Sequence, residues 1–160
     1  MEYFDVVNED DEIIGKASRK DVHDKHLIHR AVTVWTFNSK GELYMAQRSR
    51  HKDKNPLKWQ APASGHVDAG ETYEDAAQRE LKEECGFESP LKFEFKLKVF
   101  SDEQKEFFKL YTAHYGGDIK LDKEFEQAKF MSIEDIKKMI KDDPSQFRDA
   151  FLMMFDKYFS

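Results

Sequence analysis

The sequence predicts a mixed α/β (α+β) fold, in which a mixed central sheet is sandwiched between helices. Segments with the alternating or continuous apolar pattern of strands are interspersed with segments that favour helix. The 160 residues are enough for one domain with a hydrophobic core and too few for two, so residues 1–160 are expected to form a single domain. Hydrophobic residues make up 39% and charged residues 36% of the chain, a composition that argues against disorder.

Strands dominate the structure expected for the start of the chain. Residues 2–7 and 12–17 are candidate strands on either side of a polar turn, and residues 19–25 allow one or two turns of helix. Residues 29–37 are rich in Val, Thr, Trp and Phe, which predicts a buried strand. A polar turn that ends in glycine follows, so residues 42–48 are expected to return as the partner strand of a hairpin.

A helix is expected at residues 73–85, with Thr72 as an alternative start. Its Ala, Leu and Glu residues favour helix, and Gly86 stands where a glycine commonly ends one. Before this helix, residues 50–58 are expected to form a basic loop. Residues 59–67 predict irregular or short extended structure.

The last part of the chain predicts three strands and then two helices. The strands are residues 93–100 and 106–115, expected to be antiparallel, and residues 126–131. The two C-terminal helices, within residues 133–159, are expected at residues 133–141 and 144–158. Pro144 suits the first position of the second helix. Large apolar side chains recur there at helical spacing and are expected to pack on the domain's own core: Phe147, Phe151, Met154, Phe155 and Tyr158.

Charge and cysteine content exclude several classes of function. The formal net charge is -6, which argues against a surface built to hold a nucleic acid polymer. The single cysteine, Cys85, excludes an internal disulfide and suits a reducing compartment. No segment resembles a signal peptide or approaches the roughly 20 apolar residues that span a bilayer, so a cytoplasmic protein without membrane contact is expected.

Three glutamates on the predicted helix at residues 73–85 indicate a metal site. Glu80, Glu83 and Glu84 are three or four residues apart, so they project from one face. Like charges at this spacing destabilise a helix by a few tenths of a kcal/mol per pair, and no lysine follows Glu80 or Glu84 by four residues. A bound divalent cation would compensate, and carboxylate oxygens suit Mg²⁺ or Mn²⁺. The alternative is a solvated acidic face.

Further residues accompany the glutamates in a fixed spacing. The segment 65–87 places Gly65, Glu71, Arg79 and Gly86 in the pattern G-x5-E-x7-R-E-U-x-E-E-x-G-U, where U is apolar. At every defined position this segment resembles the Nudix box, and the chain therefore resembles the Nudix superfamily. The resemblance implies the Nudix fold. It also implies that Glu71 and Arg79 brace the loop, helix and loop of the box.

The resemblance also implies a catalytic site. Glu80 and Glu84 would ligate Mg²⁺ or Mn²⁺ with help from Glu83 and the Gly65 carbonyl, and the three glutamates would be the catalytic residues. The ion would polarise the phosphoryl oxygens and activate the attacking water. Three candidates for the general base stay open: Glu83, Glu124 and Glu126.

A wider resemblance, over residues 3–135, connects the chain with type I isopentenyl-diphosphate isomerases and their hydrolase relatives. It rests on the segment 29–38 and on the positions of several residues: Arg48, Lys52, Pro56, Trp59, Gly65 and His66. It implies substrate-binding roles for Arg19, Arg48 and Lys52, whose charges suit a diphosphate. It also implies a possible second metal site, formed by His29, His66, Glu106 and His23.

Two departures argue against isomerase chemistry. Ser64 stands at the position of the isomerase catalytic cysteine, and a hydroxyl is far less acidic than a thiol. Phe108 stands at the position of a catalytic carboxylate and has no proton to give. The Nudix box is intact, whereas isomerases often have a degraded one.

The expected function is therefore Mg²⁺-dependent hydrolysis of a phosphoanhydride (pyrophosphate) bond in a small diphosphate-containing substrate. A nucleoside di- or triphosphate or a derivative is favoured, and the protein is expected to be a monomer or a homodimer. One alternative is an isopentenyl-diphosphate isomerase-type activity. Another is a non-catalytic Nudix domain that senses a nucleotide, although such domains commonly lack one or more of the box glutamates.

Overall fold

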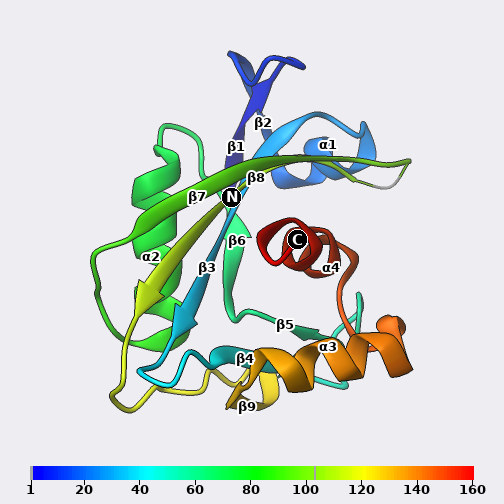
Figure 1. Cartoon of the computed structure of the whole chain (residues 1–160). Helices are drawn as coiled ribbons and strands as arrows, with labels where there is room; N and C mark the ends of the chain where they lie inside the picture. The colour runs from blue at the N-terminus through cyan, green and yellow to red at the C-terminus, as the bar shows by residue number, and fades with distance from the viewer. Residues whose placement is uncertain (1, 103) are drawn as a thin grey trace.

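The computed structural model describes residues 2–102 and 104–160, and it places a central mixed sheet between helices (Figure 1). Seven strands within the described residues form this sheet: β3 (His29–Phe37), β4 (Leu43–Arg48), β5 (Trp59–Gln60), β6 (Ala63–His66), β7 (Lys92–Phe100), β8 (Lys105–His114) and β9 (Phe125–Met131). The predicted fold class is confirmed. Most strands lie within two residues of their predicted bounds, and the segment expected to be irregular or short and extended contains β5 and β6.

Strand β3 lies at the centre of the sheet. It pairs in parallel with β8 and, on its other edge, antiparallel with β6. The antiparallel pairing of β7 with β8 confirms the prediction for these two strands. The register sets His29 opposite Glu106 and Ala31 opposite His66. Because successive side chains of a strand point to opposite faces, His29, Glu106 and His66 point to the same face of the sheet.

Strand β4 is not the main partner of β3, and the predicted hairpin pairing is wrong beyond its first residue pair. Phe37 and Leu43 alone form a pair between the two strands, and β4 pairs along its length with β9 and near its end with β5. The physical reason is competition for the edge of β3. Strand β6 occupies that edge from Ala31 to Val34, so β4 diverges and finds other hydrogen-bond partners.

Helix α2 (Tyr73–Cys85) covers one face of the sheet and has the predicted bounds (Figure 1). The Thr72 hydroxyl accepts a hydrogen bond from the Asp75 backbone N–H at 3.1 Å, and Gly86 ends the helix with a φ of 78°, which glycine adopts without strain. Its apolar side packs on the even-numbered residues of β3, Val32 and Val34. The odd-numbered Ala31 and Trp35 face the other way.

The second predicted C-terminal helix is interrupted, so the expectation of one helix at residues 144–158 is wrong. After α3 (Ile133–Asp142), a short 3-10 turn (η1, Pro144–Gln146) precedes an extended Phe147, and α4 (Asp149–Tyr158) begins only after Arg148. The cause is a tertiary contact: Phe147 forms a parallel bridge with Trp59, and the Arg148 N–H donates to the Trp59 carbonyl at 3.2 Å. The backbone is satisfied by β5 instead of by a helix.

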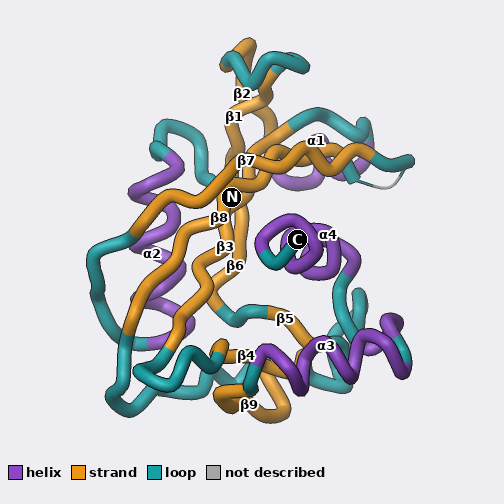
Figure 2. Tube along the Cα trace, in the orientation of Figure 1, coloured by secondary structure: helices purple, strands orange, loops and turns teal. Residues whose placement is uncertain are grey.

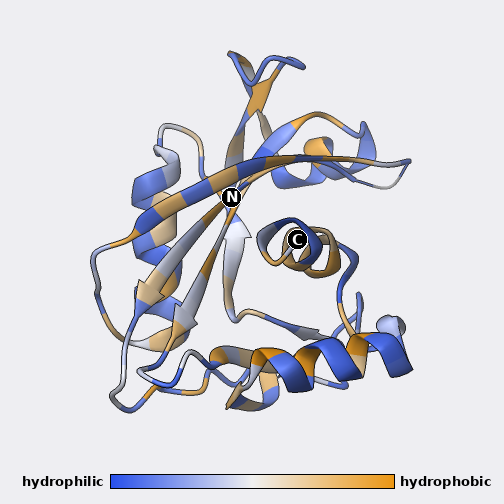
Figure 3. Cartoon of the chain, viewed as in Figure 1, coloured by the Kyte–Doolittle hydropathy of each residue, from blue (hydrophilic) through white to orange (hydrophobic). Residues whose placement is uncertain are grey.

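Helix α4 covers the face of the sheet opposite α2, as the Cα trace shows (Figure 2). Phe151, Met154 and Phe155 are buried there with Trp35, which confirms that this apolar stripe packs on the chain's own core. Helix α3 carries both apolar and charged residues along its length (Figure 3), and Ile136 on it is fully buried. Among the described residues, no helix is both long enough and apolar enough to cross a membrane.

The N-terminal strands form a sheet of their own. Strands β1 (Tyr3–Val7) and β2 (Ile13–Ser18) pair antiparallel, so they do not extend the single sheet expected from the sequence. Helix α1 (Arg19–Asp24) follows, capped by Ser18, whose hydroxyl accepts from the Asp21 N–H at 3.2 Å. This arrangement brings α1 to the end of the central sheet where β3 begins (Figure 1).

Candidate metal and phosphate site

Glu80 belongs to helix α2, and its carboxyl group lies between this helix and strand β6, directly against Gly65. It is 8% exposed. A Cβ atom at position 65 would overlap Glu80 Oε1 and lie 3.0 Å from its Oε2, so only glycine leaves room for the carboxylate. Burial raises the pKa of Glu80 to about 7, because the charged form loses contact with water.

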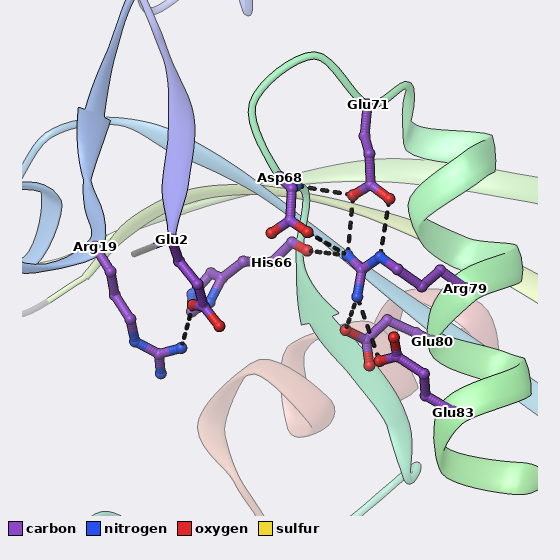
Figure 4. A network of polar contacts seen from close by, with 8 residues as sticks. All are labelled: Glu2, Arg19, His66, Asp68, Glu71, Arg79, Glu80 and Glu83. Atoms are coloured by element: carbon purple, nitrogen blue, oxygen red, sulfur yellow. Dashed lines mark hydrogen bonds and ion pairs between the residues drawn. The ribbon is translucent and has the colours of Figure 1, made fainter.

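Arg79 connects the loop before α2 to the glutamates of the helix (Figure 4). Its Nε and Nη2 atoms donate to the two carboxylate oxygens of Glu71 at 2.8 and 2.9 Å, and Nη2 also donates to the His66 carbonyl at 3.0 Å. Nη1 donates to Glu80 at 3.1 Å and contacts Glu83 at 3.5 Å. Glu71 in turn accepts from the Asp68 N–H at 2.9 Å. This geometry is suited to hold the loop and two carboxylates in place.

Glu84 lies one turn further along α2, beside two acidic residues of the loop before β9. Oxygen atoms of Glu84, Asp122 and Glu124 all lie within 4.8 Å of one another. The Oε2 atom of Glu84 is buried and has no hydrogen-bond partner among the described residues. Burial, followed by the charges of Glu124, Asp122 and Glu80, raises the pKa of Glu84 to about 8. A divalent cation with oxygen ligands fits this set of groups.

Glu84, Asp122 and Glu124 are called the acidic group below. This group is not the trio of glutamates that the sequence predicted on the helix. Glu80 and Glu83 contact Arg79, whereas Glu84 faces Asp122 and Glu124. Glu126 is exposed and accepts hydrogen bonds from the backbone and side chain of Arg50 at 2.9 and 3.1 Å. Asp122 was not foreseen, because it lies in a loop with no periodic pattern. Its acidic character in a segment leading to Glu124 was the only signal.

The four residues predicted for a second metal site come together on the opposite face of β6. Glu106 Oε1 lies 3.1 Å from His29 Nε2 and 3.5 Å from His66 Nε2. The ring of His23, on α1, lies 5.9 and 5.7 Å from the rings of His29 and His66. Burial alone would raise the pKa of Glu106, but the hydrogen bonds from the two histidines lower it well below its usual range.

Backbone carbonyls orient two of these rings. His29 Nδ1 is 2.9 Å from the Leu27 carbonyl and His23 Nδ1 is 2.9 Å from the Arg19 carbonyl. A ring whose Nδ1 is held in this way directs Nε2 away from the carbonyl, and in His29 this atom meets Glu106; rings oriented through their second nitrogen are commonly found around protein-bound metals. Two imidazoles and one carboxylate, with a third imidazole nearby, thus have the chemistry of a metal site.

The three predicted phosphate-binding residues are placed differently. Arg48, at the end of β4, donates to the Lys54 carbonyl at 3.2 Å and contacts Gln60 Oε1 at 3.5 Å. Lys52 lies 3.2 Å from Glu124 and therefore stands at the acidic group. Arg19, at the start of α1, is exposed and pairs with Glu2 at 2.9 Å (Figure 4).

Comparison with known proteins places this geometry in a family. The sequence matches the NUDIX domain over residues 27–151. The chain belongs to the Nudix family. The predicted resemblance is confirmed by individual relatives: isopentenyl-diphosphate Delta-isomerase 2 of Photorhabdus laumondii subsp. laumondii is 39% identical over 87 residues, which cover 54% of this chain and 49% of that protein.

Two further matches agree with the Nudix family. An uncharacterized Nudix hydrolase of Streptomyces coelicolor is 36% identical over 102 residues, covering 64% of this chain and 56% of that protein. The chain spans about half the length of the curated relatives it matches. The crystal structure of DR0079 from Deinococcus radiodurans has a TM-score of 0.75 at 25% identity and covers 89% of this chain and 90% of its own.

Within this Nudix domain, Ser64 and Phe108 line one small cavity on the α4 side of the sheet. The Ser64 hydroxyl donates its proton to the Ala61 carbonyl at 3.0 Å and is 2.7 Å from the Thr33 hydroxyl, so its single donor is used. Phe108 is 7% exposed. The cavity measures about 20 Å³. That volume holds one water molecule and no larger group.

Proposed function

We propose that this Nudix domain is a divalent-metal-dependent hydrolase that cleaves a phosphoanhydride bond in a small diphosphate-containing substrate, such as a nucleoside di- or triphosphate or a derivative. The observation that carries the proposal is the position of Glu84. Its buried Oε2 atom has no partner in the described chain and lies with Asp122 and Glu124 in a group of carboxylates. A divalent cation satisfies such a group, because buried carboxylates are paired or coordinate metals and because Mg²⁺ takes carboxylate oxygens as ligands.

The residues that would hold Mg²⁺ or Mn²⁺ are Glu84, Asp122 and Glu124, with Glu80, Glu83 and the Gly65 carbonyl as additional candidates. When bound, the ion supplies polarisation of the phosphoryl oxygens and neutralises charge that develops on them.

Side chains of the protein would bind the substrate and accept the proton of the attacking water. Lys52 and Arg48 would bind the phosphates. Arg19 would also bind them once its ion pair with Glu2 is broken. A water oxygen attacks phosphorus, the bond to the bridging oxygen breaks, and the water proton passes to a carboxylate. Glu83 and Glu124 are the candidates for this base. Glu126 is less suited, because Arg50 occupies its carboxylate.

The cavity at Ser64 supports hydrolysis over isomerisation. Phe108 supplies no proton, and a space of about 20 Å³ does not admit a branched five-carbon group. The cluster of His23, His29, His66 and Glu106 is proposed as a second metal site. Titration of the metal-free protein with Zn²⁺ or Mn²⁺ should show binding at this cluster that His29→Ala weakens, while Glu84→Gln leaves it unchanged.

Activity is tested by incubating the protein with Mg²⁺ and a panel of nucleoside di- and triphosphates, nucleotide sugars, dinucleotide polyphosphates and prenyl diphosphates. We expect release of a phosphate or phosphomonoester product that is lost in Glu84→Gln. The matched control is Glu88→Gln, because Glu88 is an exposed residue whose carboxylate pairs only with Lys82 among the described residues. Ligand binding without turnover anywhere in the panel would instead favour a sensing domain.

A further inference from the structure

Arg148 stands at the interruption between η1 and α4, and its side chain has no assigned role. The only hydrogen bond that this side chain makes to a described residue runs from Nη1 to Gln60 Oε1, at 3.2 Å. Arg48 Nη1 contacts the same Gln60 oxygen at 3.5 Å. Two guanidinium groups, from β4 and from the start of α4, therefore meet at one neutral oxygen atom.

This arrangement sets the two residues apart from the other arginines of the chain. The chain has six arginines, and four of them contact a carboxylate within 4.0 Å: Arg19 with Glu2, Arg30 with Asp11, Arg50 with Glu126 and Arg79 with Glu71. Within residues 2–102 and 104–160, Arg48 and Arg148 have no such partner. The two arginines without an ion pair are the two that share one oxygen.

The surroundings make these charges unfavourable without an anion. Burial lowers the pKa of both arginines, and the charge of Arg148 lowers that of Arg48 further. Glu106 and Asp149 attract Arg148 only from beyond ion-pair distance, and Glu106 already accepts from His29 and His66. Because guanidinium groups stay protonated in proteins, an anion between them is the remaining way to balance the charge.

The small cavity behind the two arginines limits which anion can bind between them. Gln60 and Arg148 line the cavity of about 20 Å³ that is closed by Phe108, Phe151 and Met154. No group larger than a water molecule enters this cavity, so an anion between the two guanidinium groups stays in front of it and cannot extend past them in this direction. An unesterified terminal phosphate carries a charge of about -1.5 to -2 at neutral pH, which matches two guanidinium groups, whereas a phosphate esterified on both sides carries only one charge.

We propose that Arg48 and Arg148 together bind the unesterified terminal phosphate of the substrate as a clamp. The phosphate would displace the side-chain oxygen of Gln60, which both guanidinium groups contact. The proposal rests on the function proposed above and deepens it, since it selects substrates whose phosphate chain has a free end. Arg48 also lies close enough to Glu124 to be influenced by its charge, so the clamped phosphate adjoins the acidic group. Arg148 is then a substrate-binding residue supplied by the C-terminal segment.

The test is calorimetric titration of the full chain in EDTA, where no metal-dependent turnover occurs, with two probes. One is inorganic pyrophosphate, and the other is its dimethyl ester, in which each phosphorus carries one methyl group. We expect pyrophosphate to bind at least about 10-fold more tightly than the diester. Arg148→Gln should lower pyrophosphate affinity by about 10- to 100-fold and remove most of this discrimination, because charge-assisted hydrogen bonds are lost. Arg148→Lys should fall between the two, since it keeps the charge without the fork.

The matched control is Arg50→Gln, which changes the net charge equally but removes an arginine that already has a carboxylate partner. Its pyrophosphate affinity should stay within about 2-fold of wild type. The melting temperature of Arg148→Gln without ligand should not fall, because an uncompensated charge has been removed. Should Arg148→Gln fold poorly, Arg48→Gln provides the same test from the other side of the clamp.

Three results would overturn the clamp: no pyrophosphate binding by the wild type at millimolar concentration, an unchanged affinity in Arg148→Gln, or equal losses for both probes. The last would mean that Arg148 supports the structure only. Failure of the clamp is distinguishable from failure of the hydrolase proposal. Arg148-dependent binding without turnover of any substrate would keep the clamp alone, and turnover with an unchanged KM in Arg148→Gln would keep the hydrolase alone.

Discussion

At the scale of single residues, the contact between Gly65 and Glu80 shows why two distant positions of the Nudix box depend on each other. The carboxylate occupies the space that any side chain at position 65 would fill. Glycine is needed here for space, and not for an unusual backbone angle, since position 65 is not among the glycines with positive φ. The box is therefore a packing requirement as well as a set of proposed metal ligands.

Gly65→Ala should consequently displace the Glu80 carboxylate. We expect a loss of stability of about 1–3 kcal/mol from overpacking, together with an apparent Mg²⁺ affinity about 10-fold weaker, measured from the metal dependence of activity. Urea unfolding gives the stability. Gly15→Ala is the control, because a Cβ there meets nothing within 4 Å, and its stability should match or exceed that of wild type. A fully stable Gly65→Ala protein with unchanged Mg²⁺ dependence would show that the contact is dispensable.

The candidate site residues predicted from the sequence came from two sources, helical spacing and family resemblance. Glu80 and Glu84 follow from helical periodicity, and His29, His66 and Glu106 from the wider resemblance. Asp122, Gln60 and Arg148 could not be found in this way. Their proximity arises from the course of a loop, the pairing of β5 and the interruption before α4, none of which has a local signal.

At the scale of elements, local propensity predicted the helices and strands, and tertiary competition decided where it failed. Residues 144–158 favour helix, yet the bridge between Phe147 and Trp59 extends two residues and delays α4. Similarly, β4 lost its place beside β3 to β6, which lies farther along the chain. Both errors concern backbone hydrogen bonds to distant segments, which a pattern within one segment does not reveal.

Asp11, in the turn between β1 and β2, connects this hairpin to the rest of the domain. Its carboxylate accepts from Arg30 Nε at 2.7 Å, from the Tyr73 hydroxyl at 2.8 Å and from Lys96 Nζ at 3.1 Å. Burial would raise the pKa of Asp11, but these three hydrogen bonds outweigh it and lower the pKa below 3.8. A lowered folded-state pKa adds stability that is present above the unfolded value and lost as the pH falls through the folded value.

Asp11→Asn should therefore cost about 1–3 kcal/mol at pH 7. Asparagine accepts the positive φ of this position, 61°, so the substitution removes the charge without straining the turn. Urea unfolding of both proteins between pH 7 and pH 2 checks the sign: the difference should be constant at neutral pH and shrink below about pH 4. A difference that persists unchanged at pH 2 would contradict the role of the Asp11 charge.

Helix α4 is expected to contribute to the core through its apolar side alone. Phe151 is 3% exposed, and its ring lies 5.5 Å from that of Trp35. Phe151→Ala should cost about 3–5 kcal/mol in the free energy of unfolding. Met153, on the same helix, is 42% exposed, so Met153→Ala should change stability by less than about 0.5 kcal/mol. Equal effects in chemical denaturation would contradict the observed orientation of α4.

At the scale of the whole molecule, strand β6 runs between two sets of side chains that are proposed to bind metal. Gly65 faces α2 and Glu80, whereas Ser64 and His66 point to the face covered by α4, because side chains alternate along the strand. The Glu80 carboxyl group therefore lies on one side of β6 and the histidine cluster on the other. On the side of the histidine cluster, the side chain of Arg148 from the C-terminal segment contacts the same Gln60 oxygen as Arg48.

Because the acidic group gathers three carboxyl groups beside a single ion-paired cation among the described residues, Lys52, metal binding should stabilise the whole fold. At a Mg²⁺ concentration 100 times Kd, binding to the native state alone contributes about 2.7 kcal/mol, which for a chain of this size raises the melting temperature by about 5–10 °C. Glu84→Gln should lose most of this increase while melting no lower than wild type in EDTA, since it replaces a buried carboxyl group whose Oε2 atom has no hydrogen-bond partner among the described residues. Glu88→Gln should retain the full increase. If Glu84→Gln melted several degrees lower in EDTA and still responded fully to Mg²⁺, Glu84 would be a structural residue and the metal would have to bind elsewhere.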